Sequence, residues 1–243
     1  MEAWILAYVL LVVTLSGIVR VVCGFGNALI AMPLLALVLD LTVVTPLVAI
    51  QSLLFSLFIL ARTHRSIHLG PAIRLFAWSL AGIPLGLLLL TGGLESFLKT
   101  GLGLIIAGYS VLCLAKRRPG HLQNDRFLPF FGLAGGVLGG AYNTNGPPIV
   151  IYGLMRGWDA PAFRATLQGY FLATGAIVSL AQGLAGLWTR EVLAFLVQSM
   201  PAVLLSVWAG QLLAGRIPAG AMERAIHCIL ILAGGLLAAR GLS

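Results

Sequence analysis

Ten apolar runs fill most of the 243-residue sequence and constrain its fold more than any other feature. Only 9% of the residues are Asp, Glu, Lys or Arg, whereas a soluble domain carries about a quarter. A helix that crosses a bilayer needs about 20 predominantly apolar residues, so the chain has room for roughly 8–10 transmembrane segments. We therefore predict an all-α polytopic membrane protein. The runs lie at about 4–22, 27–39, 43–61, 73–91, 98–115, 127–142, 147–155, 163–185, 191–213 and 220–241.

This composition excludes a soluble enzyme, a disordered chain and a nucleic-acid-binding domain. The net charge of +8 comes from 15 basic and only 7 acidic residues, so it reflects scarce acids as much as plentiful bases. The expected partners are the lipid bilayer and a small solute, with no nucleic acid. Residues 1–4 hold no basic region, so the first run is interpreted as a retained helix rather than a signal peptide. Cys23, Cys113 and Cys228 show no metal or redox spacing and are expected to be small buried hydrophobes.

Two runs, 27–39 and 147–155, are too short to cross a membrane alone. Each follows a Gly-rich or Asn-rich stretch, and each is the second of five runs in its half of the chain. A shift of 119 residues places Gly26-Asn27 over Asn145-Gly146. This agreement predicts a duplication, with an N-terminal repeat over 1–118 and a C-terminal repeat over 119–243, each containing a broken or half helix.

Lys and Arg gather in the cytoplasmic loops of membrane proteins. Their distribution along the sequence therefore tests how many of the apolar runs cross the membrane. If all ten cross, 12 of the 15 basic residues lie on one face; if the short runs enter and return, the split is nine to six. We therefore favour ten segments, with loops 62–74 and 116–126 in the cytoplasm and both termini outside. Five segments per half make the two repeats inverted, as in many secondary transporters. The cytoplasmic set is Arg20, Arg62, Arg65, Arg74, Lys116, Arg117, Arg118, Arg126, Arg156, Arg164, Arg216 and Arg224, and the outer set is Lys99, Arg190 and Arg240.

Residues 24–26 and 143–146 are predicted to be non-helical backbone inside apolar sequence. In hydrocarbon, such backbone persists only where protein buries it or where it lines a cavity. Each stretch precedes a short helix and therefore presents unpaired N–H groups and the positive end of a helix dipole. Two such ends facing each other would form a site for a small anion, and this site would need no permanently charged side chain.

The runs GFGNALIAMPLL (24–35) and NGPPIVIYGL (145–154) resemble the paired signatures of the TauE/SafE family of sulfite exporters and sulfonate-permease-type transporters. The resemblance extends to chain size, duplicated halves and motif placement. It implies a secondary transporter of the bacterial inner membrane for sulfite, organosulfonates or related small anions. Two departures stand out. Asn27-Ala28 replaces a common Gly-Gly, and 143–145 adds amide and hydroxyl donors.

The resemblance, together with the polar residues inside the runs, predicts the substrate-binding residues. Backbone N–H groups of Gly26, Asn27 and Gly146 would cradle an oxyanion, while the Asn amides would add donors; alternatively, the Asn residues only cap the helices. Alternating access of one half against the other is the expected mechanism, with no metal and no cofactor. The motifs do not distinguish uptake from export. They also leave open the coupling ion and whether the protein forms a homo-oligomer. The expected site is Gly24, Phe25, Gly26, Asn27, Gln51, Asn143, Thr144, Asn145, Gly146 and Pro147.

Several other residues favour a structural interpretation. Arg20 could attract the anion, but we expect it to extend to the cytoplasmic surface. Gln51 and Gln168 fit either a solute pathway or interhelical hydrogen bonds. His227 is expected to be a packing residue. The His64/His68 pair has metal-ligand spacing, but its arginine neighbours favour a loop at the lipid surface. Close helix packing explains Gly82, Gly86, Gly132, Gly136 and Gly140, which recur every four residues.

Two other classes of function remain as alternatives. An intramembrane enzyme would need a nucleophile with a base, a carboxylate pair or a metal set, and the sequence contains no GxSxG or HExxH motif. A cation or metal transporter would normally need buried carboxylates. The acidic residues Asp40, Asp159 and Glu223 all fall near segment ends. An anion transporter therefore remains the favoured function.

Overall fold

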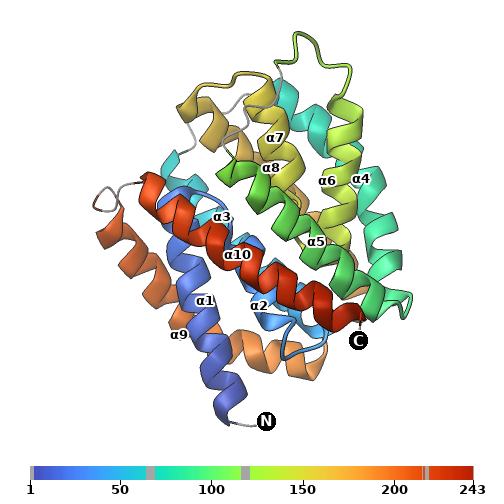
Figure 1. The fold of residues 1–243 in the computed structure, drawn as a ribbon, viewed down its shortest axis with the longest axis vertical. Coiled ribbons are helices and arrows are strands. Elements are labelled where there is room, and N and C mark those ends of the chain that lie inside the picture. Colours follow the sequence, from blue (N-terminus) through green and yellow to red (C-terminus); the bar gives the residue numbers. More distant parts are fainter. Residues whose placement is uncertain (1–2, 64–68, 116–120, 215, 217–218, 243) are drawn as a thin grey trace.

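The structure is a computed structural model that describes residues 3–63, 69–115, 121–214, 216 and 219–242, and these residues form ten helices (Figure 1). Each helix coincides with one predicted apolar run, which confirms the all-α prediction. The helices are α1 (Ala3–Cys23), α2 (Asn27–Leu35), α3 (Leu41–Thr63), α4 (Leu69–Thr91), α5 (Glu95–Leu114), α6 (Leu128–Tyr142), α7 (Gly146–Met155), α8 (Ala160–Leu184), α9 (Arg190–Leu213) and α10 (Ala219–Leu242).

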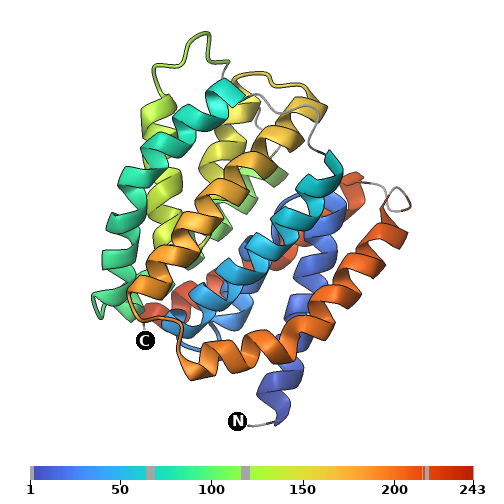
Figure 2. The same ribbon diagram turned by 180° about the vertical axis from the view of Figure 1, so that it is seen from behind.

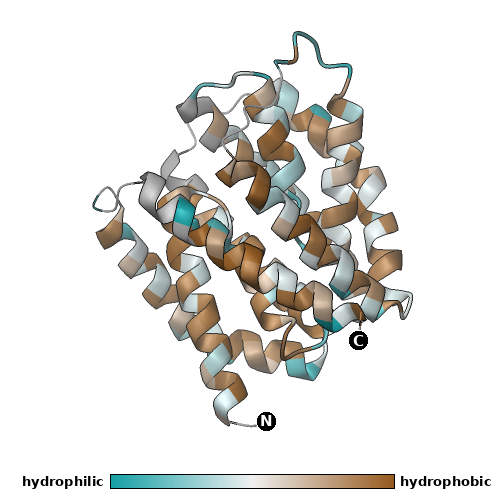
Figure 3. Ribbon diagram, in the orientation of Figure 1, coloured by the Kyte–Doolittle hydropathy of each residue, from teal (hydrophilic) through white to brown (hydrophobic). Residues whose placement is uncertain are grey.

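Hydrophobic residues predominate along the helices, as the brown colouring of the ribbon shows (Figure 3). Among the described residues, five helical segments are long and apolar enough to cross a membrane. The helices α2 and α7 contain only 9 and 10 residues, as the two short runs predict. These observations make the chain a multi-pass membrane protein. The five segments are Ala3–Cys23, Leu41–Ile59, Gly70–Thr91, Glu95–Leu114 and Arg190–Leu213.

The most extensive helix contacts join the N-terminal part of the chain to the C-terminal part. The helix α4 packs against α6, α5 against α10, α1 against α9 and α3 against α8. Figure 1 shows α5 and α10 crossing the front of the molecule, and Figure 2 shows α3 and α8 on the opposite face. Each pair takes one helix from each half, so the halves interdigitate instead of forming separate bundles.

Glycines bring α4 and α6 into backbone contact. A Cβ atom added to Gly82, Gly86 or Gly136 would lie within 3 Å of backbone atoms on the facing helix. The same holds for Gly103 of α5 and Gly234 of α10. Small residues allow this approach in membranes, where helix association depends on close packing. The structural interpretation of the repeated glycines is therefore confirmed for the α4–α6 pair.

A polar cluster around Asp125 connects the ends of α4, α6 and α7. One carboxylate oxygen of Asp125 lies 2.8 Å from Nη2 of Arg74, at the start of α4. The other lies 3.1 Å from Nε of Arg156 and accepts a hydrogen bond of 2.7 Å from the Tyr152 hydroxyl. This hydrogen bond, reinforced by the two arginines, lowers the pKa of Asp125. The cluster fixes the loop before α6 to the end of α7.

Candidate functional site

Two breaks in helical structure occur where the sequence predicts non-helical backbone. Between α1 and α2, Gly24 and Gly26 have φ values of +85° and +106°, which favour glycine. Between α6 and α7, Asn143 has a φ value of +52°, and asparagine tolerates this left-handed region better than most residues. Each break turns the chain from a longer helix into a short one.

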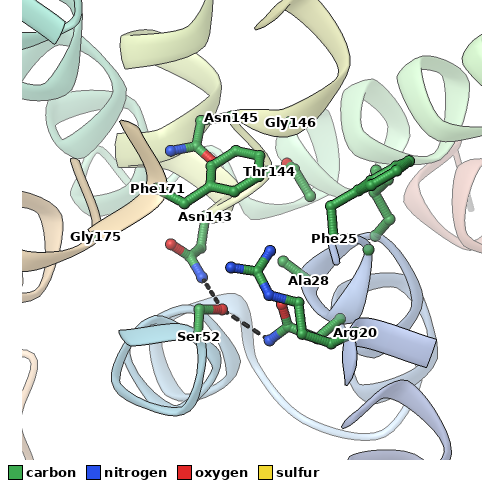
Figure 4. A pocket seen from close by; sticks show the side chains of 13 residues that line it. Arg20, Phe25, Ala28, Ser52, Asn143, Thr144, Asn145, Gly146, Phe171 and Gly175 are labelled. Carbon is green, nitrogen blue, oxygen red and sulfur yellow. Dashed lines mark hydrogen bonds between the residues drawn. The ribbon is translucent and has the colours of Figure 1, made fainter. Parts of the chain in front are cut away.

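Both breaks border one cavity of about 30 Å³ (Figure 4). The cavity joins the start of α2 to the start of α7, with additional walls from α1, α3 and α8. Seven of the ten predicted site residues line it, namely Phe25, Gly26, Asn27, Asn143, Thr144, Asn145 and Gly146. The lining residues that the prediction missed are Arg20, Ala28, Leu29, Ser52, Phe171 and Gly175.

The other three predicted residues do not line this cavity. The backbone carbonyl of Gly24 accepts a hydrogen bond from the Gln168 side chain. The Gln51 side chain points to α9 and donates a hydrogen bond of 2.8 Å to Ser199. Pro147 lies in the first turn of α7, where its missing N–H group leaves no bond unmade.

Arg20 is buried at the cavity, so the expectation that it reaches the membrane surface is wrong. Its side chain is 3% exposed, and Nη2 donates hydrogen bonds to Ser56 Oγ at 2.7 Å and to Gln168 Oε1 at 3.1 Å. Its guanidinium carbon lies 5.0 Å from the ring centre of Phe171, a cation–π distance. These contacts with uncharged groups hold the guanidinium group inside the protein. Within the described part of the chain, no carboxylate pairs with it.

Ser52 connects the two breaks through hydrogen bonds, drawn in Figure 4. Its Oγ accepts from Asn27 Nδ2 at 2.8 Å and from Asn143 Nδ2 at 3.0 Å. A hydroxyl group has two acceptor positions and one donor. Both acceptor positions are thus occupied, and in the described part of the chain no hydrogen bond donated by Ser52 is present, so its proton is available for a ligand.

Further donors surround the cavity. Thr144 Oγ1 and Arg20 Nε are buried and have no hydrogen-bond partner among the described residues. The first N–H groups of a helix have no partner within the helix, and Asn27, Ala28 and Leu29, which begin α2, all line the cavity. No Asp or Glu is among the lining residues. A cavity rich in donors and without acids is suited to a small anion.

The remaining candidates lie away from this cavity. The His227 ring packs edge-on against Tyr109, with 5.9 Å between ring centres, which supports the packing interpretation. Cys23 is half-buried and Cys228 is exposed, so the expectation of buried cysteines is wrong for Cys228. Its thiol is on the apolar outer surface of α10. The predicted histidine pair, His64 and His68, lies outside the described residues.

Comparison with models of protein families identifies the family of this chain. The family model described as "Sulfite exporter TauE/SafE" matches residues 9–237, nearly the whole chain. No curated protein and no solved structure matches the chain significantly. Members of the matched family are transporters rather than enzymes, which removes the intramembrane-enzyme alternative. The chain belongs to the TauE/SafE sulfite exporter family and is a multi-pass membrane transporter.

Proposed function

We propose that this protein is a secondary transporter for small anions such as sulfite or short organosulfonates, and that it binds them in the cavity between the starts of α2 and α7. The observation that carries the proposal is a buried cation, Arg20, which no carboxylate of the described residues pairs with, in a cavity whose lining includes no acid. A cation carrier would place acceptor groups at such a site instead.

The buried charge of Arg20 favours an anionic ligand. Moving a charge out of water is costly unless an opposite charge compensates for it. Ser56 and Gln168 supply only neutral acceptors, so a bound anion would provide the missing charge. Arg20 Nε and Thr144 Oγ1 would then gain the hydrogen-bond partners that they lack. Hydrogen bonds to charged groups contribute about 1.5–3 kcal/mol each.

The volume of the cavity favours a substrate of few atoms. A water molecule needs roughly 10–15 Å³ of such volume, so a cavity of about 30 Å³ has room for about two or three water-sized groups. An inorganic oxyanion such as sulfite fits this size better than a long-chain sulfonate. We therefore expect affinity to decrease as the organic part of the substrate grows.

Helix packing supports the proposal that residues 1–118 and 119–243 are inverted repeats. Exchanging each helix with the one five places along the chain turns the α4–α6 pair into α9–α1, another observed pair. The same exchange leaves α3–α8 and α5–α10 unchanged. A pseudo-twofold axis would place the starts of α2 and α7 opposite each other, with substrate between them. Rocking of one half against the other would then expose the site alternately to each side.

Reporter fusions test the inverted topology in the bacterial inner membrane. Five crossings per half place the loop at Gly93 outside and the segment at His121 in the cytoplasm. A phosphatase reporter after Gly93 should therefore be active, and one after His121 inactive. Reporters that indicate the same side at both positions would contradict the inverted repeats.

Equilibrium binding to the purified protein tests the substrate class. Sulfite, sulfate, short and long sulfonates and carboxylates are titrated as sodium salts, with the chlorides of sodium, potassium and magnesium as controls. We expect binding of the smallest sulfur oxyanions and competition among them. Binding of a cation from its chloride salt, without binding of any oxyanion, would favour the cation-transporter alternative.

A further inference from the structure

Three buried polar side chains at one end of the α3–α8 interface have no hydrogen-bond partner in the described chain. They are Thr45 on α3 and Ser179 and Gln182 on α8, and none is more than 4% exposed. The unpaired atoms are both amide atoms of Gln182 and the hydroxyl oxygens of Thr45 and Ser179. Buried polar groups are almost always paired, so three such side chains on two packed helices require an explanation.

Neighbouring contacts define how α3 and α8 lie against each other. Ala49 of α3 and Val178 of α8 belong to one small buried cluster, together with Ile83 of α4. A Cβ atom added to Gly175 would meet the side chain of Leu53. Residue numbers therefore rise along α3 while they fall along α8, so the two helices are antiparallel where they pack (Figure 2).

The unpaired side chains lie on one side of the cavity along this interface. Thr45 is one helical turn before Ala49 and Gln182 one turn after Val178, so they are at a similar level. In the opposite direction, beyond the cavity, Ser56 and Gln168 both bind Arg20. The cavity therefore lies between a hydrogen-bonded end of the interface and an end whose polar groups are unpaired.

We propose that the anion passes between the cavity and the outer side of the membrane through this end of the α3–α8 interface. When the two helices separate, the Gln182 amide and the hydroxyls of Thr45 and Ser179 bind the oxyanion as it passes. When the helices close, these groups lose their partners, which raises the free energy of the closed interface and favours opening. This inference rests on the proposed function.

The direction of this route follows from the topology. The end of α3 near Thr45 is opposite the end that leads into loop 62–74. The predicted loop is shorter in the structure, where Arg62 lies at the end of α3 and Arg74 near the start of α4; with Arg65 of the sequence between them, these basic residues mark the cytoplasmic side. The route from the cavity past Gln182 therefore leads outward.

The variant Gln182→Leu tests the role of the amide, with Gln198→Leu as a matched control. Gln198 is exposed on α9 and does not line the cavity. We expect Gln182→Leu to reduce anion flux in proteoliposomes at least 10-fold, while equilibrium anion binding changes less than 3-fold. Its melting temperature should be unchanged or higher, because an unpaired amide has been removed.

Wild-type flux in a folded Gln182→Leu variant would overturn the route. Failure of the wild-type protein to bind or transport any anion would instead contradict the proposed function, so the two failures are distinguishable.

Thiol labelling of Ser179→Cys provides a second test if Gln182→Leu does not fold. A small, water-soluble thiosulfonate reagent is added outside sealed vesicles, with and without transported anion. The wild-type protein, with its three native cysteines, gives the background. We expect Ser179→Cys to react at least 5-fold faster than background during transport. Labelling at the background rate under both conditions would overturn the route.

Discussion

Replacing Arg20 by methionine tests whether the buried cation binds the substrate. Methionine retains much of the length and apolar volume of the side chain but removes the charge and all donors. The Nε atom of Arg20 is buried and has no hydrogen-bond partner in the part of the chain that the structure describes, so a bound anion would accept at least one charge-assisted hydrogen bond from it. Such a bond contributes about 1.5–3 kcal/mol, which corresponds to a loss of affinity of about 10- to 150-fold.

The same substitution also leaves neutral groups without a partner, and this effect must be separated from binding. Ser56 Oγ and Gln168 Oε1 accept hydrogen bonds from Arg20. The loss of these two bonds should lower the free energy of unfolding by about 1–3 kcal/mol. Titration calorimetry with sulfite measures affinity, and thermal unfolding of the ligand-free protein measures stability. Both are recorded on the folded, detergent-purified protein.

Two control variants separate charge from shape. Arg20→Lys keeps the positive charge but not the planar arrangement of donors, so its affinity should lie between those of wild type and Arg20→Met. Arg190→Met removes an exposed arginine at the start of α9 and should bind sulfite like wild type. An affinity of Arg20→Met within 3-fold of wild type would refute the role of Arg20.

Three further predictions follow from the fold and the cavity. Asn145→Leu, which removes the 2.8 Å hydrogen bond to Thr174, should weaken sulfite binding about 5- to 150-fold (about 1–3 kcal/mol); unchanged transport would exclude this amide from the site. Gly136→Ala should destabilise the protein by about 1–3 kcal/mol, because its Cβ meets α4 backbone, whereas Gly235→Ala, which meets nothing within 4 Å, should not lower the melting temperature. The lowered pKa of Asp125 means that its carboxylate stabilises the fold above the unfolded pKa of about 3.9, and that this contribution is lost as the pH falls through the lower folded pKa. Asp125→Asn should therefore reduce stability at pH 7 by about 1 kcal/mol, with a smaller difference from wild type in acid; equal melting curves at pH 7 would contradict this role.

Hydropathy and charge predicted the helices well because a membrane imposes length and composition on each segment. The prediction was less accurate for α2, which ends at Leu35 although the apolar run continues to 39. Residues 36–39 form a turn that is as apolar as the helix before it. Composition alone does not distinguish a buried turn from a helix.

The backbone breaks at the cavity were also predictable, because Gly26 and Asn143 are residue types that permit left-handed backbone. The position of Arg20 was not, since its hydrogen-bond partners are 36 and 148 residues away in the sequence. Its place immediately before the Gly24 motif was the only local signal. Similarly, Gln51 and Ser52 are adjacent on α3, but Gln51 binds Ser199 of α9 while Ser52 faces the cavity, and only the packed structure distinguishes the two.

Anion flux across reconstituted liposomes tests the central claim most directly. Purified protein is reconstituted, and fluxes of sulfite, sulfate, sulfonates and carboxylates are measured under imposed proton or sodium gradients. We expect saturable flux of a small sulfur oxyanion, reduced at least 10-fold in Arg20→Met and unchanged in Arg190→Met. The absence of anion flux under every gradient, or equal flux in wild type and Arg20→Met, would contradict an anion transporter built around Arg20.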